Sequence, residues 1–184
     1  GVRRDHHDHR SAIVAGTNSS PIAAHVAPRR PPRLVLVFPD RQPLDGGTPT
    51  QLTAFHLEDF GAVPSPDGQR FAFVSNREGS DRVFVQRLDG RGVARLMADK
   101  RKPDDTERDP VWMPDGTSIL VTVKIGDKSR IARVDVATHQ TLWTSAGPGN
   151  EQLPRPSRDG RYIAFVSDRS GNADVFVMRA NGRD

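Results

Sequence analysis

Short apolar runs alternate with polar segments over most of the chain, and three of them are nearly continuous. These runs lie at 71–75, 119–123 and 163–167. A strand that is covered on both faces has this pattern, because no side chain along it needs to face water. Each run is followed, after a polar connection, by a second apolar run, at 82–86, 130–134 and 174–178. The pattern predicts paired strands and an all-β fold.

The segments around these runs repeat. Residues 62–75, 110–123 and 154–167 align on an Asp-Gly pair that begins at 67, 115 and 159. In such a turn glycine takes the positive-φ position and aspartate bonds to the turn backbone. A spacing of more than forty residues is typical of a whole structural unit, not of a single hairpin.

Each unit predicts four antiparallel strands, which we denote A to D. Strand A runs into the Asp-Gly turn, and the two apolar runs are strands B and C. Asp89-Gly90 and Asn181-Gly182 predict hairpin turns after strand C, and strand D is expected at 93–97 and 140–144. Repeated four-stranded units of this length predict the blades of a β-propeller.

An upstream unit is degraded. Its strand C is expected at 34–38 and its strand D at 50–53, with a degraded strand B at 13–15. We therefore divide the chain into a poorly ordered Pro/Arg/His-rich segment, 1–33, and propeller repeats over 34–184. This division predicts about four blades, two of them complete, in an incomplete or open propeller. An apolar face at each end and a bare last edge predict self-association.

Composition narrows the function classes. The 184 residues carry 27 basic and 23 acidic side chains, a net charge of +4, and the two signs are interspersed. We interpret the one dense basic stretch, 29–33, as a solvated loop and expect no nucleic-acid partner. No apolar run approaches the roughly 20 residues of a membrane-spanning helix. The chain has no cysteine, which is compatible with the periplasm or the cytoplasm.

Motifs for catalysis or metal binding are weak. No Gly-x-Ser-x-Gly elbow occurs, so we expect no catalytic residue and no enzyme activity in this chain. The cluster His6-His7-Asp8-His9 is metal-like, but at a terminus it is expected to be solvated. Oxygen-bearing residues alternate from Asp168 to Asp174, but the glycine and carboxylate positions of a calcium loop are missing. We therefore predict turn stabilisation there, and no metal or cofactor.

Acidic residues mark the entrance to each strand A. Asp59, Glu107 and Glu151 each lie eight residues before a turn aspartate. These entrances share one face of a propeller with the connections between strands B and C. The three acids either bind a cation or a basic peptide, or solvate the rim of the channel. The predicted partner-binding face combines these acids with residues of the B–C connections, namely Asn76, Arg77, Glu78, Asp168 and Arg169.

Two stretches resemble a known repeat. Pro-x-Trp-x-Pro-Asp-Gly at 110–116, and the residues from Val166 to Met178, are similar to the TolB-like β-propeller repeat. Pro64 and Pro156 depart from this pattern, because each occupies the repeat position that Trp112 occupies in the second repeat. The resemblance implies a binding role in the bacterial envelope, with a lipoprotein or outer-membrane protein as partner and a periplasmic location.

Two functions remain open at this point. The first is a non-catalytic protein-interaction module of the bacterial cell envelope, whose signal peptide is not in this chain. The alternative is the gating propeller of a prolyl-oligopeptidase-type serine peptidase whose catalytic domain is not in this chain. An α/β domain encoded after Asp184 would favour the second.

Overall fold

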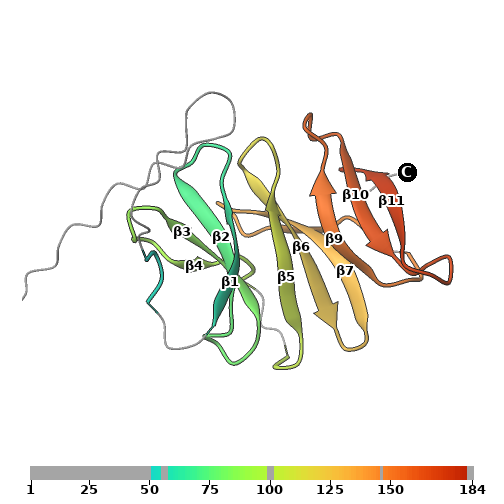
Figure 1. Cartoon of the computed structure of the whole chain (residues 1–184), viewed down its shortest axis with the longest axis horizontal. Helices are drawn as coiled ribbons and strands as arrows, with labels where there is room; N and C mark the ends of the chain where they lie inside the picture. Colours follow the sequence, from blue (N-terminus) through green and yellow to red (C-terminus); the bar gives the residue numbers. More distant parts are fainter. Residues whose placement is uncertain (1–50, 55–57, 99–101, 146, 182–184) are drawn as a thin grey trace, which may run out of the picture. The chain divides into compact units, whose positions relative to one another are not determined.

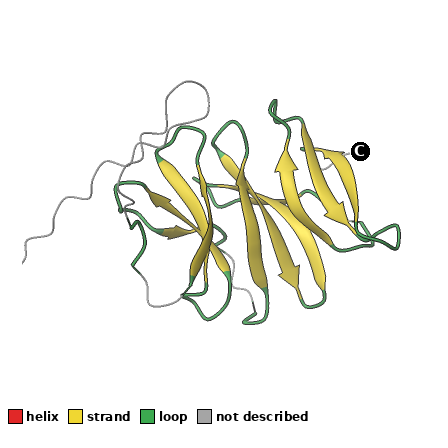
Figure 2. Cartoon of the chain, in the orientation of Figure 1, coloured by secondary structure: helices red, strands yellow, loops and turns green. Residues whose placement is uncertain are grey.

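The computed structural model describes residues 51–54, 58–98, 102–145 and 147–181. Within these ranges the chain forms strands and turns and no helix (Figure 2). The all-β prediction is confirmed. Segment 1–33 and the predicted strands at 13–15 and 34–38 lie outside the described residues. The predicted strand D at 50–53 does not form over its described part, residues 51–53.

The strands form three antiparallel sheets, which we call the first, middle and last blades (Figure 1). The first blade has the order β1 (Asp59–Pro64), β2 (Arg70–Ser75), β3 (Arg82–Arg87), β4 (Ala94–Arg95). The middle blade has the order β5 (Thr106–Trp112), β6 (Ser118–Ile125), β7 (Lys128–Asp135), β8 (Thr141–Trp143). The last blade has three described strands, β9 (Glu151–Pro156), β10 (Tyr162–Ser167) and β11 (Asp174–Arg179). Two blades are therefore complete, and the last lacks strand D among the described residues, as predicted.

The Asp-Gly turns join strands A and B as predicted. Gly68, Gly116 and Gly160 have φ values of 65°, 68° and 70°, a region that L side chains rarely adopt. The turn aspartates bond to the backbone two residues on. Asp67 Oδ1 accepts the N–H of Gln69 at 3.0 Å, and Asp159 Oδ1 accepts the N–H of Arg161 at 3.1 Å.

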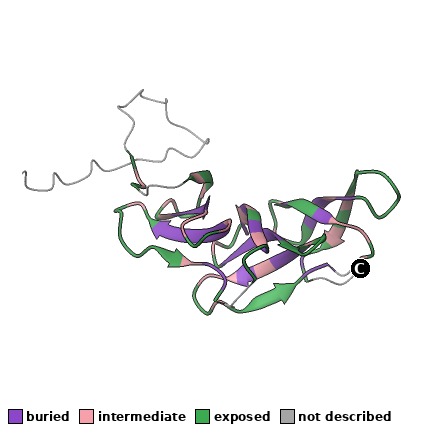
Figure 3. Cartoon of the chain, turned by 90° about the horizontal axis from the view of Figure 1, so that it is seen from below, coloured by how far each residue is buried: buried purple, intermediate pink, exposed green. Residues whose placement is uncertain are grey.

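Burial follows from which faces of each blade are covered (Figure 3). In β2 every residue from Phe71 to Ser75 is buried, and β6 is buried from Ser118 to Val123. One apolar cluster lies between the first and middle blades, and a second lies between the middle and last blades. β10 instead alternates between buried and less buried positions, because only one of its faces meets a neighbouring blade.

The prediction of an apolar face at each end is right for the last blade and wrong for the first. Val175 and Val177 of β11 are 73% and 66% exposed. In the first blade Phe71, Phe73 and Phe84 are at most 4% exposed, and the ring of Phe73 stacks on Phe71 and packs at a tilt against Phe84. Partly buried Leu52 and Leu88 pack against this cluster, so that face is covered.

A bulge recurs in every strand A, and the sequence patterns did not predict it. The pairing register with strand B shifts in β1, β5 and β9. At the same repeat position, six residues before the turn aspartate, φ is 63° at Gly61, 52° at Asp109 and 55° at Leu153. A residue in this conformation is a common device for bending a strand and re-aiming its side chains.

Candidate functional site

The three acids at the strand A entrances lie beside the ends of the B strands. Asp59 pairs with Ser75, Glu107 with Val123 and Glu151 with Ser167. Strand B ends where the B–C connection begins, so each acid is adjacent to that connection in its own blade. The predicted association of the acids with the B–C connections is therefore confirmed.

In the first blade an arginine of the B–C connection binds the acid. Arg77 Nη2 lies 3.1 Å from Asp59 Oδ1, and Arg77 Nε donates to Ser75 Oγ at 2.9 Å. The guanidinium also lies over the rings of Phe73 and Phe84, at 5.1 and 4.6 Å from the ring centres. Burial opposes ionisation of Asp59, but hydrogen bonds from Ser75, Thr53 and Arg77 outweigh it and lower the pKa.

The last blade repeats this arrangement, which we call the arginine clasp. Arg169 Nη2 bonds to Glu151, Arg169 Nε donates to Ser167 Oγ at 3.2 Å, and the guanidinium covers Phe165 and Phe176. The two ring distances, 5.1 and 4.9 Å, match those of the first blade.

The connection into β9 packs closely against this clasp. A Cβ atom on Gly147 would lie 2.7 Å from Arg169 Nη2, and one on Gly149 would lie 2.6 Å from the Arg169 backbone nitrogen. Asp168 accepts the backbone N–H of Asn150 at 2.6 Å and its side-chain amide at 2.9 Å. Equivalently, Asn76 Oδ1 accepts the backbone N–H of Glu58 at 3.2 Å. Both B–C connections are therefore anchored to the start of strand A.

In the middle blade, the acid at the start of strand A has a different kind of partner. Ile125 stands where the other blades have arginine, and Glu107 instead binds the first blade. Glu107 Oε2 accepts the N–H of Val83 at 3.0 Å, and Glu107 Oε1 accepts from Arg95 Nη2 at 3.3 Å. Glu78 also pairs with Arg95 at 3.3 Å. Glu107 therefore joins the middle blade to the first blade.

The acids do not form a solvated rim. Glu107 and Glu151 are 0% exposed, and burial raises the pKa of each carboxyl, against the lowering effect of their arginines. No group of three metal-ligating side chains comes together among the described residues. The interpretation in which these carboxylates solvate the rim of a channel is therefore wrong for Glu107 and Glu151. Partner binding by the eight predicted residues stays a prediction.

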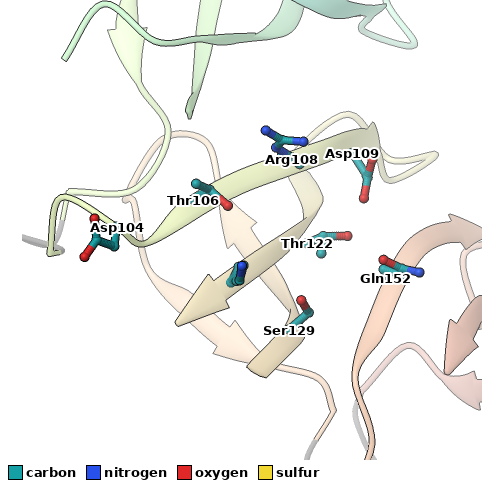
Figure 4. Close-up of a pocket in the computed structure, with 8 residues that line it drawn as sticks. Asp104, Thr106, Arg108, Asp109, Thr122, Ser129 and Gln152 are labelled. Atoms are coloured by element: carbon teal, nitrogen blue, oxygen red, sulfur yellow. The ribbon is translucent and has the colours of Figure 1, made fainter. Parts of the chain in front are cut away.

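A polar hollow of about 300 Å³ lies between the middle blade and β9 (Figure 4). Thr106, Arg108 and Asp109 line it from β5, and Gln152 faces them from β9. Its remaining lining residues are Asp104, Thr122, Lys124 and Ser129. A second hollow of about 360 Å³ shares Lys124, Ser129 and Gln152 and extends to Asp168.

The hollow was not predicted from the sequence. The signal that could have found it is the polar Thr122 within the otherwise apolar run 119–123, since a covered strand has no need of a hydroxyl there. Thr122 Oγ1 accepts the N–H of Leu153 at 3.2 Å across the two blades.

The remaining candidates are accounted for by local structure. Ser170 Oγ bonds to Asp174 Oδ2 at 2.6 Å while Asp168 binds Asn150, so these oxygens stabilise the turn as predicted. The His6–His9 cluster lies outside the described residues. In the described ranges no helix is long and apolar enough to cross a membrane.

Similarity to known proteins supports the repeat assignment. No family model matches the chain. The protein TolB homolog of Chlorobium luteolum is 33% identical over 135 residues, which cover 73% of this chain. The uncharacterized peptidase YuxL of Bacillus subtilis is 43% identical over 116 residues, or 58% of this chain. The crystal structure of TolB from Acinetobacter baumannii superposes with a TM-score of 0.62 at 27% identity, over 76% of this chain.

The chain spans only a part of each of these proteins. It covers 29% of the TolB homolog, 16% of the peptidase and 34% of the TolB crystal structure. Repeated four-stranded blades with Asp-Gly turns, together with these likenesses, show that the chain belongs to the TolB-like β-propeller repeat family.

Proposed function

We propose that this chain is a non-catalytic protein-interaction module of the bacterial cell envelope, in the periplasm. The observation that carries the proposal is the pair of adjoining polar hollows at the end where the B–C connections lie. Their lining mixes acids, bases and amides, with Asp109 and Asp127 beside Arg108 and Lys124. Such a surface suits an extended peptide with both backbone and charged groups to satisfy.

The clasped loops support this proposal, because a binding surface loses less entropy when its loops are already ordered. Hydrogen bonds to the start of strand A anchor Asn76 and Asp168, and ion pairs hold Arg77 and Arg169. In this proposal Asp59, Glu107 and Glu151 act by positioning the binding face, while Glu78 and Asp168, which are exposed, meet the partner. By family resemblance, the partner is an envelope lipoprotein or an outer-membrane protein.

Peptide binding tests the proposal. A random peptide library would be selected on the immobilised chain, and a selected peptide titrated by calorimetry against two charge-reversal variants. Lys124→Glu alters both hollows and is expected to weaken binding about tenfold, a change of about 1.4 kcal/mol. Arg158→Glu is the matched control, because Arg158 is exposed in the Asp-Gly turn at the opposite end of the last blade and lines neither hollow. Equal affinities of the two variants, or no selectable peptide, would contradict the proposal.

A second candidate function rests on the likeness to the uncharacterized peptidase, the more similar relative in percent identity. In this second function, the chain is the gating propeller of a prolyl-oligopeptidase-type serine peptidase, and the same hollows select which substrates pass. The encoding gene separates the two candidates. An α/β-hydrolase domain with a Gly-x-Ser-x-Gly elbow in the same reading frame would support the peptidase.

A further inference from the structure

A basic hollow lies at the Asp-Gly end of the last blade, at the opposite end from the two polar hollows. Its volume is about 380 Å³, within the range of roughly 300–1,000 Å³ that small-molecule pockets have. Arg133 lines it from the middle blade, and Arg161, Tyr162, Arg179 and Ala180 line it from the last blade. Three arginines from two blades therefore meet at one hollow, and no acidic residue is among the described residues that line it.

The arginines are particular to this interface, as the corresponding place between the first and middle blades shows. Equivalent positions follow from the pairing register and from the distance to the turn aspartate. The equivalents of Arg133, Arg161 and Arg179 are Val85, Thr117 and Asp135. At these positions the first interface has one acid and no arginine, so the cluster is not a feature that every repeat carries.

Smaller side chains open the hollow. Between the first and middle blades, Val136 packs against the apolar cluster, and Arg70 Nη2 donates to the carbonyl of Gly116 at 3.1 Å. At the equivalent positions between the middle and last blades, Ala180 replaces Val136 and Ser118 replaces Arg70. These two replacements remove contacts that close the first interface at this end, which explains the space between the middle and last blades.

The hollow has one positive charge in excess. Arg161 Nε pairs with Asp159 at 2.6 Å, and Arg133 Nη2 pairs with Asp115 at 3.3 Å. Arg179 is exposed and forms no ion pair with a residue that the structure describes. A guanidinium has five N–H donors, so donors also remain on Arg133 and Arg161 after these pairs form.

We propose that this hollow binds an oxyanion, a phosphate or carboxylate group of a small ligand, through Arg179 and Arg161. The guanidinium group presents a planar fork of donors that matches two oxygens of such a group. The Tyr162 hydroxyl, on a side chain that is 44% exposed, supplies a further donor. Because Arg179 brings the excess charge, the anion binds without displacing Asp115 or Asp159. The site is separate from the polar hollows and does not depend on the proposed function.

Titration with inorganic phosphate tests the proposal. The chain, labelled with nitrogen-15, would be titrated at constant ionic strength, so that screening between exposed charges stays the same. The backbone amide and arginine Nε–H signals would be followed by NMR. We expect saturable shifts at Arg161, Tyr162 and Arg179, with a dissociation constant of about 1 mM.

A parallel titration with acetate identifies the oxyanion. Binding of phosphate that is tighter by about tenfold or more would assign the site to a phosphate group, because a second charge and further oxygens then contribute. Acetate binding that comes closer to phosphate binding than this, or exceeds it, would assign the site to a carboxylate group. Absence of saturable shifts with both anions would overturn the proposal.

Two variants test the assigned residues. Arg179→Gln should weaken phosphate binding about tenfold, because it removes charge-assisted hydrogen bonds. Arg158→Gln is the matched control and should change binding by less than about twofold, since Arg158 is exposed in the same blade's Asp-Gly turn but does not line the hollow. Tyr162→Phe leaves every charge in place and should weaken binding about threefold, the effect of one hydrogen bond.

Equal weakening by Arg179→Gln and Arg158→Gln would mean that phosphate follows only the net charge of the chain. Unchanged binding in both Arg179→Gln and Tyr162→Phe would mean that phosphate binds elsewhere. Either result would overturn the proposal.

Discussion

At Leu153 the backbone adopts a φ of 55°, in a conformation that glycine takes without penalty at the equivalent Gly61. A left-handed conformation costs an ordinary L residue roughly 1–2 kcal/mol, because Cβ crowds the following carbonyl oxygen. The position is the bulge of strand A, so the strain arises from the strand's bend. Leu153 is also 43% exposed, so its side chain buries little surface in return.

Replacing this leucine should therefore stabilise the chain. We expect Leu153→Gly to raise the free energy of unfolding by about 0.5–1 kcal/mol, measured by urea denaturation. The reciprocal variant Gly61→Leu is the control and should lower it by about 1–2 kcal/mol. The new Cβ atom would meet only Val74 Cγ2, at 3.7 Å, which is ordinary van der Waals contact, so the Cβ atom itself would not clash. If Leu153→Gly does not stabilise the chain and Gly61→Leu does not destabilise it, the bulge carries no strain.

Titration of Glu107 should make stability depend on pH. Burial raises its pKa above the ordinary 4.5, so the folded chain binds this proton more tightly than the unfolded chain. The contribution of Glu107 to the unfolding free energy is therefore fully present below pH 4.5 and is lost as the pH rises through the raised pKa.

We expect Glu107→Gln to remove this decline when unfolding free energies are compared between pH 4.5 and pH 7. Asp159→Asn is a control of opposite sign. The Ser157 hydroxyl and the Arg161 backbone N–H lower the pKa of Asp159, so its contribution is present above 3.8 and is lost in stronger acid. If the unfolding free energy of Glu107→Gln still declines over this pH range, another group causes the decline. Glu151 is the first candidate, because burial also raises its pKa.

At the scale of elements, the arginine clasp accompanies the long B–C connections. β2 and β3 are joined by residues 76–81, and β10 and β11 by residues 168–173. In the middle blade, β6 and β7 are paired out to Ile125 and Lys128, so only Gly126 and Asp127 connect them. A two-residue hairpin is held by its own ladder, whereas a six-residue loop needs side-chain contacts to be ordered. This explains why Ile125 can replace arginine.

Removing the clasp from the first blade should cost stability. We expect Arg77→Ala to lower the unfolding free energy by about 2 kcal/mol, because Asp59 loses its only arginine partner among the described residues and two phenylalanine rings lose a stacked cation. Arg77→Lys should recover only part of this loss, since an ammonium cannot bond to Ser75 and Asp59 while it stacks. Arg87→Ala is the control, because its pair with Asp89 is exposed and should contribute less than about 0.5 kcal/mol. A loss for Arg77→Ala as small as the control's would contradict the assigned role.

At the scale of the molecule, the two interfaces between blades differ. Trp112 Nε1 donates to the carbonyl of Val63 at 3.1 Å, and the Arg70 guanidinium lies 5.0 Å from its ring centre. Pro156 takes the tryptophan position in the last blade and has no such donor. Trp112 therefore joins the first and middle blades specifically.

Truncating Trp112 should uncouple these blades. We expect Trp112→Phe to cost about 1 kcal/mol, one buried hydrogen bond, and Trp112→Ala about 3–5 kcal/mol. Hydrogen exchange should then show β1 and β2 opening at lower free energy than β9 and β10. Tyr162→Phe is the control, since Tyr162 is 44% exposed, and should have little effect. Uniform loss of protection across all three blades would mean that they unfold as one unit.

The sequence alone determined the strands of the three aligned repeats, the Asp-Gly turns and the placing of Asp59, Glu107 and Glu151 at one end of each blade. It did not determine the upstream unit, since the strand predicted at 50–53 does not form over residues 51–53. The features that it did determine are local, because a nearly continuous apolar run marks a strand that is covered on both faces, and turn geometry follows from Asp and Gly themselves. A repeat also transfers the register of one unit to the next, so the alignment of the three units is enough to identify equivalent positions.

Only the tertiary structure decided what each acid contacts. Glu151 is bound by an arginine eighteen residues away in its own blade, while Glu107 is bound by Arg95 and Val83 of the preceding blade. Both carboxylates are buried, although the sequence pattern suggested a rim facing water. Whether a charge is solvated depends on the residues that meet it in space, and here those come from other strands or another blade. The sequence predicted an apolar face at each end, and only the tertiary structure showed that the face of Val175 and Val177 is exposed while the face of the first blade is covered.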